Sequence, residues 1–243
     1  MQFDYATFTN IGGRNVNEDA TLCCLHEQTT LLAAVADGLG GHGGGEIASS
    51  TALSALEASL KRLIPPSEET LRAVCGELNQ AVLAAQTDQI KMKTTLAMAL
   101  ANQDTLAFLH VGDSRIYYFH EGEIAYQSAD HSVSQLAVLA NEITKEQIRF
   151  HEDRSRLLRS LGSEGSAAPE IRLFPGAPVP GDALLLCTDG FWEYVLEKDM
   201  LKELKHTKNA KDWLERMTGY IRRRAGKKND NNSAVAVRMK PAR

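Results

Sequence analysis

The stretch Leu31 to Ser50, LLAAVADGLGGHGGGEIASS, joins an apolar segment to a helical pattern through a glycine-rich loop. The apolar part has the composition of a buried strand and ends at Asp37, and six of the eight residues from Gly38 to Gly45 are glycine. A carboxylate at the end of a buried strand costs free energy unless its charge is paired. A metal ion is the partner that best suits an acid followed by bare backbone, so acids in similar places elsewhere are candidates for the same site.

The same arrangement recurs at other apolar segments of the chain. Glu18 and Asp19 precede the segment 20–25, Asp113 ends LAFLHVGD, Asp189 ends ALLLCTD, and Asp230 stands just ahead of AVAVRM. Oxygen ligands without an accompanying set of cysteines and histidines select hard cations, so Mg²⁺ or Mn²⁺ is expected rather than zinc. Two such ions about 3.5–4 Å apart, sharing one aspartate, would activate a bridging water for in-line displacement at phosphorus. Arg14 is placed to hold a phosphate through its planar guanidinium.

Length and composition favour one compact domain over residues 1–243, because 43% of the chain is apolar and only 7 residues are proline. The net charge of −4 gives no general basic surface for nucleic acid. The four cysteines show no CxxC spacing and are expected as reduced core thiols. There is no signal-peptide pattern and no apolar run near the ~20 residues of a membrane span. We therefore expect a cytoplasmic protein, and a monomer.

Hydrophobic periodicity predicts strands and helices in alternating blocks. The expected strands are 3–9, 20–25, 30–36, 94–102, 104–113, a hairpin over 115–128, 183–190 and 233–239. The expected helices are 46–64, 67 to about 91, 130–141, 144–161, 197–205 and 210–224, with an irregular segment over 162–181. This order fits two sheets with helices outside, a layered α+β domain.

Other phosphate chemistries fit the chain less well. Gly38, Gly40 and Gly43 match the dinucleotide fingerprint GxGxxG, but Asp37 would press a carboxylate toward the pyrophosphate. No Lys-Ser or Lys-Thr follows the glycines, which excludes a P-loop. No cysteine is followed six positions later by arginine, no DxD pair occurs, and GDSR is not the GxSxG elbow of a serine hydrolase.

The ordered motifs resemble those of the metal-dependent Ser/Thr protein phosphatases of type 2C, in their bacterial branch. They are RxxNED at 14–19, VxDGxGG at 35–41, GDSR at 112–115, DHS at 130–132, TDG at 188–190 and DNxS at 230–233, and they span nearly the whole chain. This resemblance implies a four-layer α-β-β-α sandwich of two antiparallel sheets flanked by helix pairs. It also implies a metal cleft at one end of the sandwich.

The resemblance implies a role for each matching residue. Asp37, Asp189 and Asp230 would bind one ion, and Glu18, Asp37 and the Gly38 carbonyl would bind the other. Asp113 and Asp189 would serve a third, weaker site, Asp19 would orient the attacking water, and Arg14 would hold the substrate phosphate. A water bridging the two ions would attack phosphorus directly, without a phosphoenzyme. Leu39 stands where eukaryotic members place a histidine, which leaves His42 as a candidate for proton delivery.

We therefore expect a Mn²⁺- or Mg²⁺-dependent protein serine/threonine phosphatase that acts on phosphorylated proteins, in opposition to a cognate Ser/Thr kinase. The alternative is a pseudophosphatase that binds phosphoproteins without turnover, and the complete set of carboxylates argues against it. Four residues near the motifs are expected in other roles: Trp192 and Trp213 in the core, His131 as a structural hydrogen-bonding group, and Glu164 at the surface.

Overall fold

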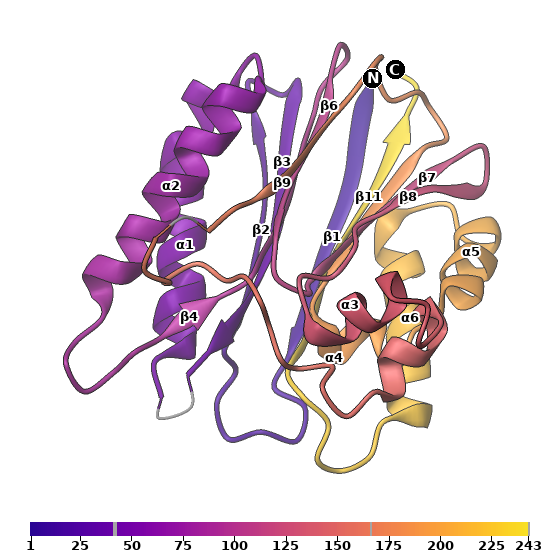
Figure 1. Ribbon diagram of the computed structural model, residues 1–243. Helices are drawn as coiled ribbons and strands as arrows, with labels where there is room; N and C mark the ends of the chain where they lie inside the picture. Colours follow the sequence, from indigo (N-terminus) through magenta and orange to yellow (C-terminus); the bar gives the residue numbers. More distant parts are fainter. Residues whose placement is uncertain (41–42, 166, 243) are drawn as a thin grey trace.

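Two antiparallel β-sheets pack face to face in the computed structural model, which describes residues 1–40, 43–165 and 167–242 (Figure 1). One sheet has the strand order β1 (Gln2–Asn10), β11 (Asn232–Lys240), β10 (Ala183–Cys187), β7 (Arg115–His120) and β8 (Glu123–Gln127). The other has the order β2 (Asp19–His26), β3 (Thr30–Leu39), β5 (Leu96–Ala101), β6 (Leu106–Val111) and β9 (Glu170–Phe174), with the short β4 (Lys93–Thr94) paired to β3. Every pairing between these strands is antiparallel, so they contain no parallel βαβ unit of the dinucleotide-binding kind.

Helix pairs cover the outer faces of both sheets, which confirms the predicted four-layer α-β-β-α sandwich (Figure 1). Helices α1 (Gly45–Ser59) and α2 (Glu68–Ala85), joined through the 3₁₀ turn Leu60–Leu63, pack on the sheet that contains β3. Helices α5 (Glu197–His206) and α6 (Ala210–Arg224) pack on the sheet that contains β10. None of the helices in the described ranges is long and apolar enough to cross a membrane.

The position of β3 explains why its sequence is apolar at every position rather than at alternate ones. Leu31, Ala33 and Val35 face the core between the two sheets. Leu32 and Ala34 face the core under α1 and α2. Because a strand in the middle of the sandwich is covered on both faces, all these side chains are fully buried. The chain leaves this packed strand at Asp37 and Gly38, which brings the predicted metal ligands to the end of the sandwich.

Some predicted elements differ from the structure in the segment between β8 and β9. The helix expected over 144–161 is wrong: only Lys145–Phe150 forms a 3₁₀ helix. The rest of that segment uses its backbone groups to pair with distant residues, since Leu161 bridges to Thr94 and Leu157 to Ser132. Pairing with other segments therefore overrides the local helical preference there.

The other differences concern where elements begin and end. The irregular segment 162–181 contains the edge strand β9, which pairs only with β6 among the described strands. Helix α2 ends at Ala85 rather than near residue 91, and the helix expected over 130–141 is the shorter α3 (Val133–Leu139). Strand β10 ends at Cys187, and the short helix α4 (Asp189–Trp192) begins at the predicted metal ligand. Trp192 and Trp213 are buried core residues, as predicted.

Candidate active site

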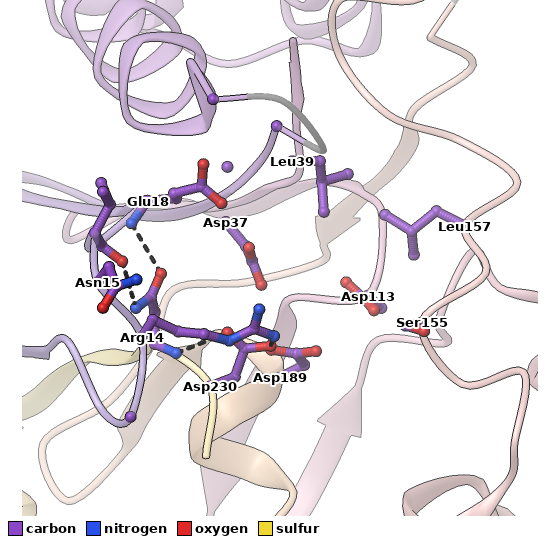
Figure 2. A pocket seen from close by; sticks show the side chains of 16 residues that line it. Arg14, Asn15, Glu18, Asp37, Leu39, Asp113, Ser155, Leu157, Asp189 and Asp230 are labelled. Atoms are coloured by element: carbon purple, nitrogen blue, oxygen red, sulfur yellow. Dashed lines mark hydrogen bonds and ion pairs between the residues drawn. The ribbon is translucent and has the colours of Figure 1, made fainter. Parts of the chain in front are cut away.

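The predicted site residues meet at one end of the sandwich, in a pocket of about 670 Å³ (Figure 2). The lining includes Arg14, Glu18, Asp37, Gly38, Asp113, Asp189 and Asp230. They come from both sheets: Asp37 lies near the end of β3, Asp189 follows β10, and Asp230 precedes β11. Asp19 lies beneath the lining, directly across from Asp37 in the β2–β3 pair. His42 and Gly41 lie outside the described residues.

The central carboxylates Asp37 and Asp189 are partly buried, and neither forms an ion pair with a cationic side chain in the part of the chain that the structure describes. Burial, followed by the charge of Asp189, raises the pKa of Asp37 well above its usual range. Burial, followed by the charge of Asp113, does the same to the pKa of Asp189. Among the described residues, Oδ1 of Asp189 and Oδ1 of Asp19 have no hydrogen-bond partner. Buried carboxylate oxygens without partners are the donor set that a hard divalent cation satisfies, so these residues fit the implied metal centre.

The glycine loop packs closely on Glu18, and this contact requires small residues. A Cβ atom on Gly45 would lie 2.6 Å from both Cδ and Oε1 of Glu18, and one on Gly38 would lie 2.6 Å from the Glu18 carbonyl oxygen. The amide of Gly38 also donates to that carbonyl at 3.1 Å. Glycine at these positions therefore lets the loop close against the acid and leaves the Gly38 backbone open to the pocket.

Side chains between the acids hold the pocket together, and the sequence analysis assigned them no role. Asn231 accepts from the Glu18 amide at 2.9 Å and donates to the carbonyls of Ile11 and Val16, at 2.8 and 3.0 Å. Thr188 donates from Oγ1 to Asp19 Oδ2 at 2.8 Å. Both residues belong to the motifs that carry the acids, DNxS and TDG. Their place in these motifs is the sequence feature from which a role in the site could have been predicted. Asn231 therefore fixes the backbone that carries Glu18, and Thr188 orients the Asp19 carboxylate.

Arg14 reaches across the pocket mouth to Asp230. Its Nη2 atom lies 2.6 Å from Asp230 Oδ2, and the two side chains are 57% and 36% exposed. The charge of Asp230 is the largest cause of the raised pKa of Arg14. The predicted phosphate-binding group and a predicted metal ligand are therefore paired with each other in this structure.

Asp113 is buried in the turn after β6, and a hydrogen bond from a core side chain holds its backbone. Its backbone carbonyl accepts from the Trp192 indole at 2.9 Å. Burial, then the charge of Asp130, raises the pKa of Asp113 to about 7. The Arg115 guanidinium stacks over the Trp192 ring, 3.6 Å from its centre. Trp192 is thus more than a core residue, because it links the turn of Asp113 to the helix of Asp189.

Two predictions for residues outside the pocket are confirmed. His131 Nδ1 accepts from the Gly112 amide at 3.1 Å, so His131 is a structural hydrogen-bonding group. Glu164 is exposed. All four cysteines are free thiols, with Cys75 and Cys187 buried.

Comparisons with known proteins place the chain in a family. Residues 9–231 match the family model of protein phosphatase 2C. The serine/threonine phosphatase stp of Listeria monocytogenes is 34% identical over 200 residues, which cover 79% of this chain and 79% of that protein. The crystal structure of the Mycobacterium tuberculosis serine/threonine phosphatase PstP/Ppp is 30% identical, has a TM-score of 0.82, and covers 99% of this chain and 100% of that one. The catalytic domain of PstP in complex with two manganese ions is 29% identical, with a TM-score of 0.81, and covers 98% of this chain and 99% of that one.

The fold and the acidic pocket define a metal-dependent phosphomonoester hydrolase. The chain belongs to the protein phosphatase 2C family. It is a protein serine/threonine phosphatase, which is an enzyme rather than a silent phosphoprotein-binding module.

Proposed function

We propose that the pocket binds two divalent cations, Mn²⁺ or Mg²⁺, through Glu18, Asp37, the Gly38 carbonyl, Asp189 and Asp230. The observation that carries the proposal is the buried negative charge at Asp37 and Asp189, which no described side chain neutralises. None of the described lining residues is a histidine or cysteine, so the ligand set suits hard cations. The manganese-bound PstP domain supports the same choice of ions.

The residues of the chain then share the work of hydrolysis. Divalent ions, when bound, supply positive charge that activates water and offsets the charge on the phosphoryl oxygens. Arg14, at the exposed rim, donates N–H groups to those oxygens and orients the phosphate. Asp19 orients the attacking water through Oδ1, because Thr188 already holds Oδ2. Water attacks phosphorus directly, so no phosphoenzyme forms.

Asp113 and Asp189 are proposed to hold a third ion more weakly. Asp113 lines the same pocket, and its charge is the largest electrostatic cause of the raised pKa of Asp189. Two carboxylates with few further protein oxygens leave most ligand positions to water, which makes such a site weak. This ion is therefore expected to exchange readily while the other two remain bound.

The proposed substrates are proteins phosphorylated on serine or threonine by a cognate Ser/Thr kinase. The pocket is open enough to admit a side-chain phosphate, and its rim is formed by Arg14. We propose that residues 1–243 act as one monomeric phosphatase domain. The four free thiols support a reducing compartment, the cytoplasm.

Metal removal combined with one substitution tests the proposal. Hydrolysis of a phosphothreonine peptide should stop in EDTA and return with Mn²⁺, because no side chain among the described residues forms an ion pair with Asp37 or Asp189. Asp37→Asn should lower kcat/KM at least about a hundredfold, the cost of one electrostatic group in a catalytic site. It should also remove the rise in Tm that Mn²⁺ causes in the wild type, since an ion that binds only the folded state adds stability.

Glu164→Gln is the matched control, because Glu164 is an exposed acid outside the pocket. It should keep both the activity and the Mn²⁺ response. Full activity in EDTA, or an unchanged Mn²⁺ response in Asp37→Asn, would contradict the two-ion assignment.

A further inference from the structure

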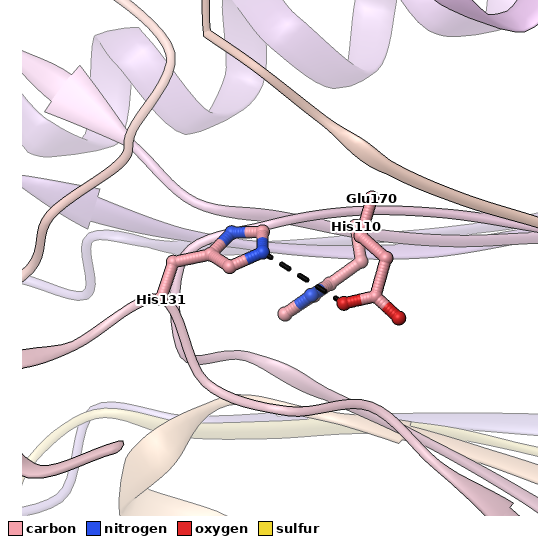
Figure 3. Close-up of side chains that lie close together, drawn as sticks. All are labelled: His110, His131 and Glu170. Atoms are coloured by element: carbon pink, nitrogen blue, oxygen red, sulfur yellow. Dashed lines mark ion pairs between the residues drawn. The ribbon is translucent and has the colours of Figure 1, made fainter. Parts of the chain in front are cut away.

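A second group of metal-binding side chains lies outside the acidic pocket (Figure 3). His110 is on β6, Glu170 faces it as its partner residue on β9, and His131 belongs to the DHS motif. One ligand atom from each side chain lies within 4.8 Å of the others. The rings of His110 and His131 have centroids 4.7 Å apart.

His110 is a buried polar side chain that makes no well-formed hydrogen bond within the described ranges, although the Ser114 backbone lies close enough to raise its pKa slightly against the effect of burial. It is 1% exposed, and neither ring nitrogen has a hydrogen-bond partner among the described residues. Burying a polar group without a partner is unfavourable, so an unpartnered imidazole in a packed core requires an explanation. Burial lowers the pKa of His110 to about 4 and the pKa of His131 to about 3. Both rings are therefore neutral at pH 7, the state in which imidazole binds metals.

Glu170 supplies the third ligand and an opening to solvent. Its Oε1 accepts from the Tyr126 hydroxyl at 3.2 Å, which orients the carboxylate. Its Oε2 lies 3.9 Å from His131 Nε2, and the side chain is 39% exposed. An ion can therefore enter from the Glu170 side, and a water molecule can complete its coordination there.

We propose that His110, His131 and Glu170 form a binding site for one transition-metal cation of the Zn²⁺ class, separate from the acidic pocket. Two imidazole nitrogens and one carboxylate oxygen are ligands that Zn²⁺ prefers, with a fourth position left for water. Tetrahedral coordination at about 2 Å requires ligand atoms about 3.3 Å apart, so Glu170 and the His131 ring must rotate toward the ion. The Tyr126 hydroxyl provides the outer contact that commonly orients a metal ligand.

Occupancy of this site would act on Asp113 through His131. The Nδ1 atom of His131 accepts from the Gly112 amide, so the proton of the neutral ring is on Nε2. When a metal binds Nε2, that proton moves to Nδ1. Nδ1 can then no longer accept the hydrogen bond from the Gly112 amide. Gly112 has a φ of +104° and directly precedes Asp113, so the turn that carries Asp113 must shift. We therefore expect zinc-class ions at this site to slow the phosphatase.

A nearby positive charge must move when the ion binds. Arg159 Nη1 lies 3.4 Å from His131 Nε2 and also donates to the Ala168 carbonyl at 3.0 Å. Arg159 is exposed, so its side chain can turn into solvent and leave the negative charge of Glu170 to the ion. Arg115, the other guanidinium close to His110, is already neutralised by Asp130.

Calorimetric titration of Zn²⁺ into the Mn²⁺-saturated protein tests the site. The wild type and the control Glu164→Gln should each bind one Zn²⁺ per chain. Glu170→Gln, which keeps an acceptor for Tyr126, should bind it at least about tenfold more weakly, because loss of an outer partner alone costs that much. Asp37→Asn should bind it as the wild type does, since Asp37 belongs to the other site.

The outcomes separate the new site from the acidic pocket. Absence of zinc binding, equal binding by Glu170→Gln, or loss of binding in Asp37→Asn would each overturn the proposal. His110→Gln should abolish the visible absorption of tetrahedral Co²⁺ in the same protein, and if this variant does not fold, Glu170→Gln alone decides.

The effect on activity is tested separately, because it rests on the proposed role of Asp113 whereas binding does not. At saturating Mn²⁺, zinc should lower kcat on a phosphopeptide in the wild type and not in Glu170→Gln at the same concentration. Equal inhibition of both proteins would overturn the link to Asp113. Whether the zinc site exists would then be decided by the calorimetric titration alone.

Discussion

Asp130 is buried and Asp189 is partly buried near the same end of the sandwich, and their carboxylates have different partners. Asp130 receives two hydrogen bonds from Arg115, at 2.8 Å from Nε and 2.7 Å from Nη2, and both side chains are almost fully buried. Asp189 has an oxygen with no partner among the described residues, and the neighbouring charges that most affect its pKa are those of Asp113 and Asp230. One carboxylate is neutralised by Arg115, and the other is a ligand in the proposed metal centre.

This difference separates structural from functional charge without reference to any relative. A buried ion pair with matched geometry contributes to a unique packing. Its two charges neutralise each other, so it offers no free charge to a ligand. A buried carboxylate cluster lowers the stability of the metal-free protein and thereby favours binding of the missing ion. Substitutions in the two regions should therefore respond to metal in opposite ways.

The largest effect on stability is expected from Arg115→Ala. It leaves Asp130 buried without its partner, so we expect a loss of about 3–5 kcal/mol that Mn²⁺ does not recover. Urea unfolding with and without Mn²⁺ measures it. Arg72→Ala is the control, because Arg72 pairs with Glu68 at the surface and should cost less than about 1 kcal/mol. A loss in Arg115→Ala that Mn²⁺ fully reversed would place this pair in the metal centre instead.

A smaller effect, on activity alone, is expected from Arg14→Ala. Arg14, which is more than half exposed, is the proposed phosphate-binding group, so kcat/KM should fall about tenfold to a thousandfold, as expected for loss of one charge-assisted contact. Metal affinity should be unchanged or slightly higher, since Arg14 no longer competes for Asp230. Steady-state kinetics and Mn²⁺ calorimetry measure the two quantities, and loss of metal binding would make Arg14 a structural residue.

The smallest expected effect is a pH dependence of the metal-free protein. Burial raises the pKa of Asp19 to about 7, above an unfolded value of about 3.9. Because the folded state holds this proton more tightly, the contribution to stability is complete below pH ~4 and is lost as pH rises through 7. In EDTA, Tm should therefore fall between pH 5 and 8, and Asp19→Asn should show a shallower fall. Identical slopes in the two proteins would mean that Asp19 does not titrate in this range.

Much of the fold and of the acidic pocket could be predicted from the sequence, because each acid follows or precedes an apolar strand. Asp37 lies near the end of β3 and Asp189 lies two residues after β10, and both strands are buried on two faces, so the burial around these acids could be predicted from the neighbouring residues. The layered architecture followed from the order of strands and helices. These signals are local, and local patterns report burial well.

Features that depend on contacts between distant segments could not be predicted. The segment 151–161 is polar and helix-like in sequence, yet its backbone pairs with Thr94 and Ser132. Strand β9 is a short edge strand that pairs only with β6 among the described strands, and it lies between prolines. Glu170 lies near His110 and His131 only because β9 pairs with β6. This group of three side chains therefore could not be predicted without the position of β9.

The origin of Asp37 and Asp189 in different sheets has a consequence far from the pocket. Their separation depends on how the two sheets pack, and that packing involves inner-face side chains such as Ala33, Ala99 and Leu184. Protein cores are close-packed, so an added methylene at Ala99 would push the layers apart. The width of the catalytic centre is therefore adjustable from residues that no substrate touches, and variation in the middle of the sandwich can tune which ion fits at its end.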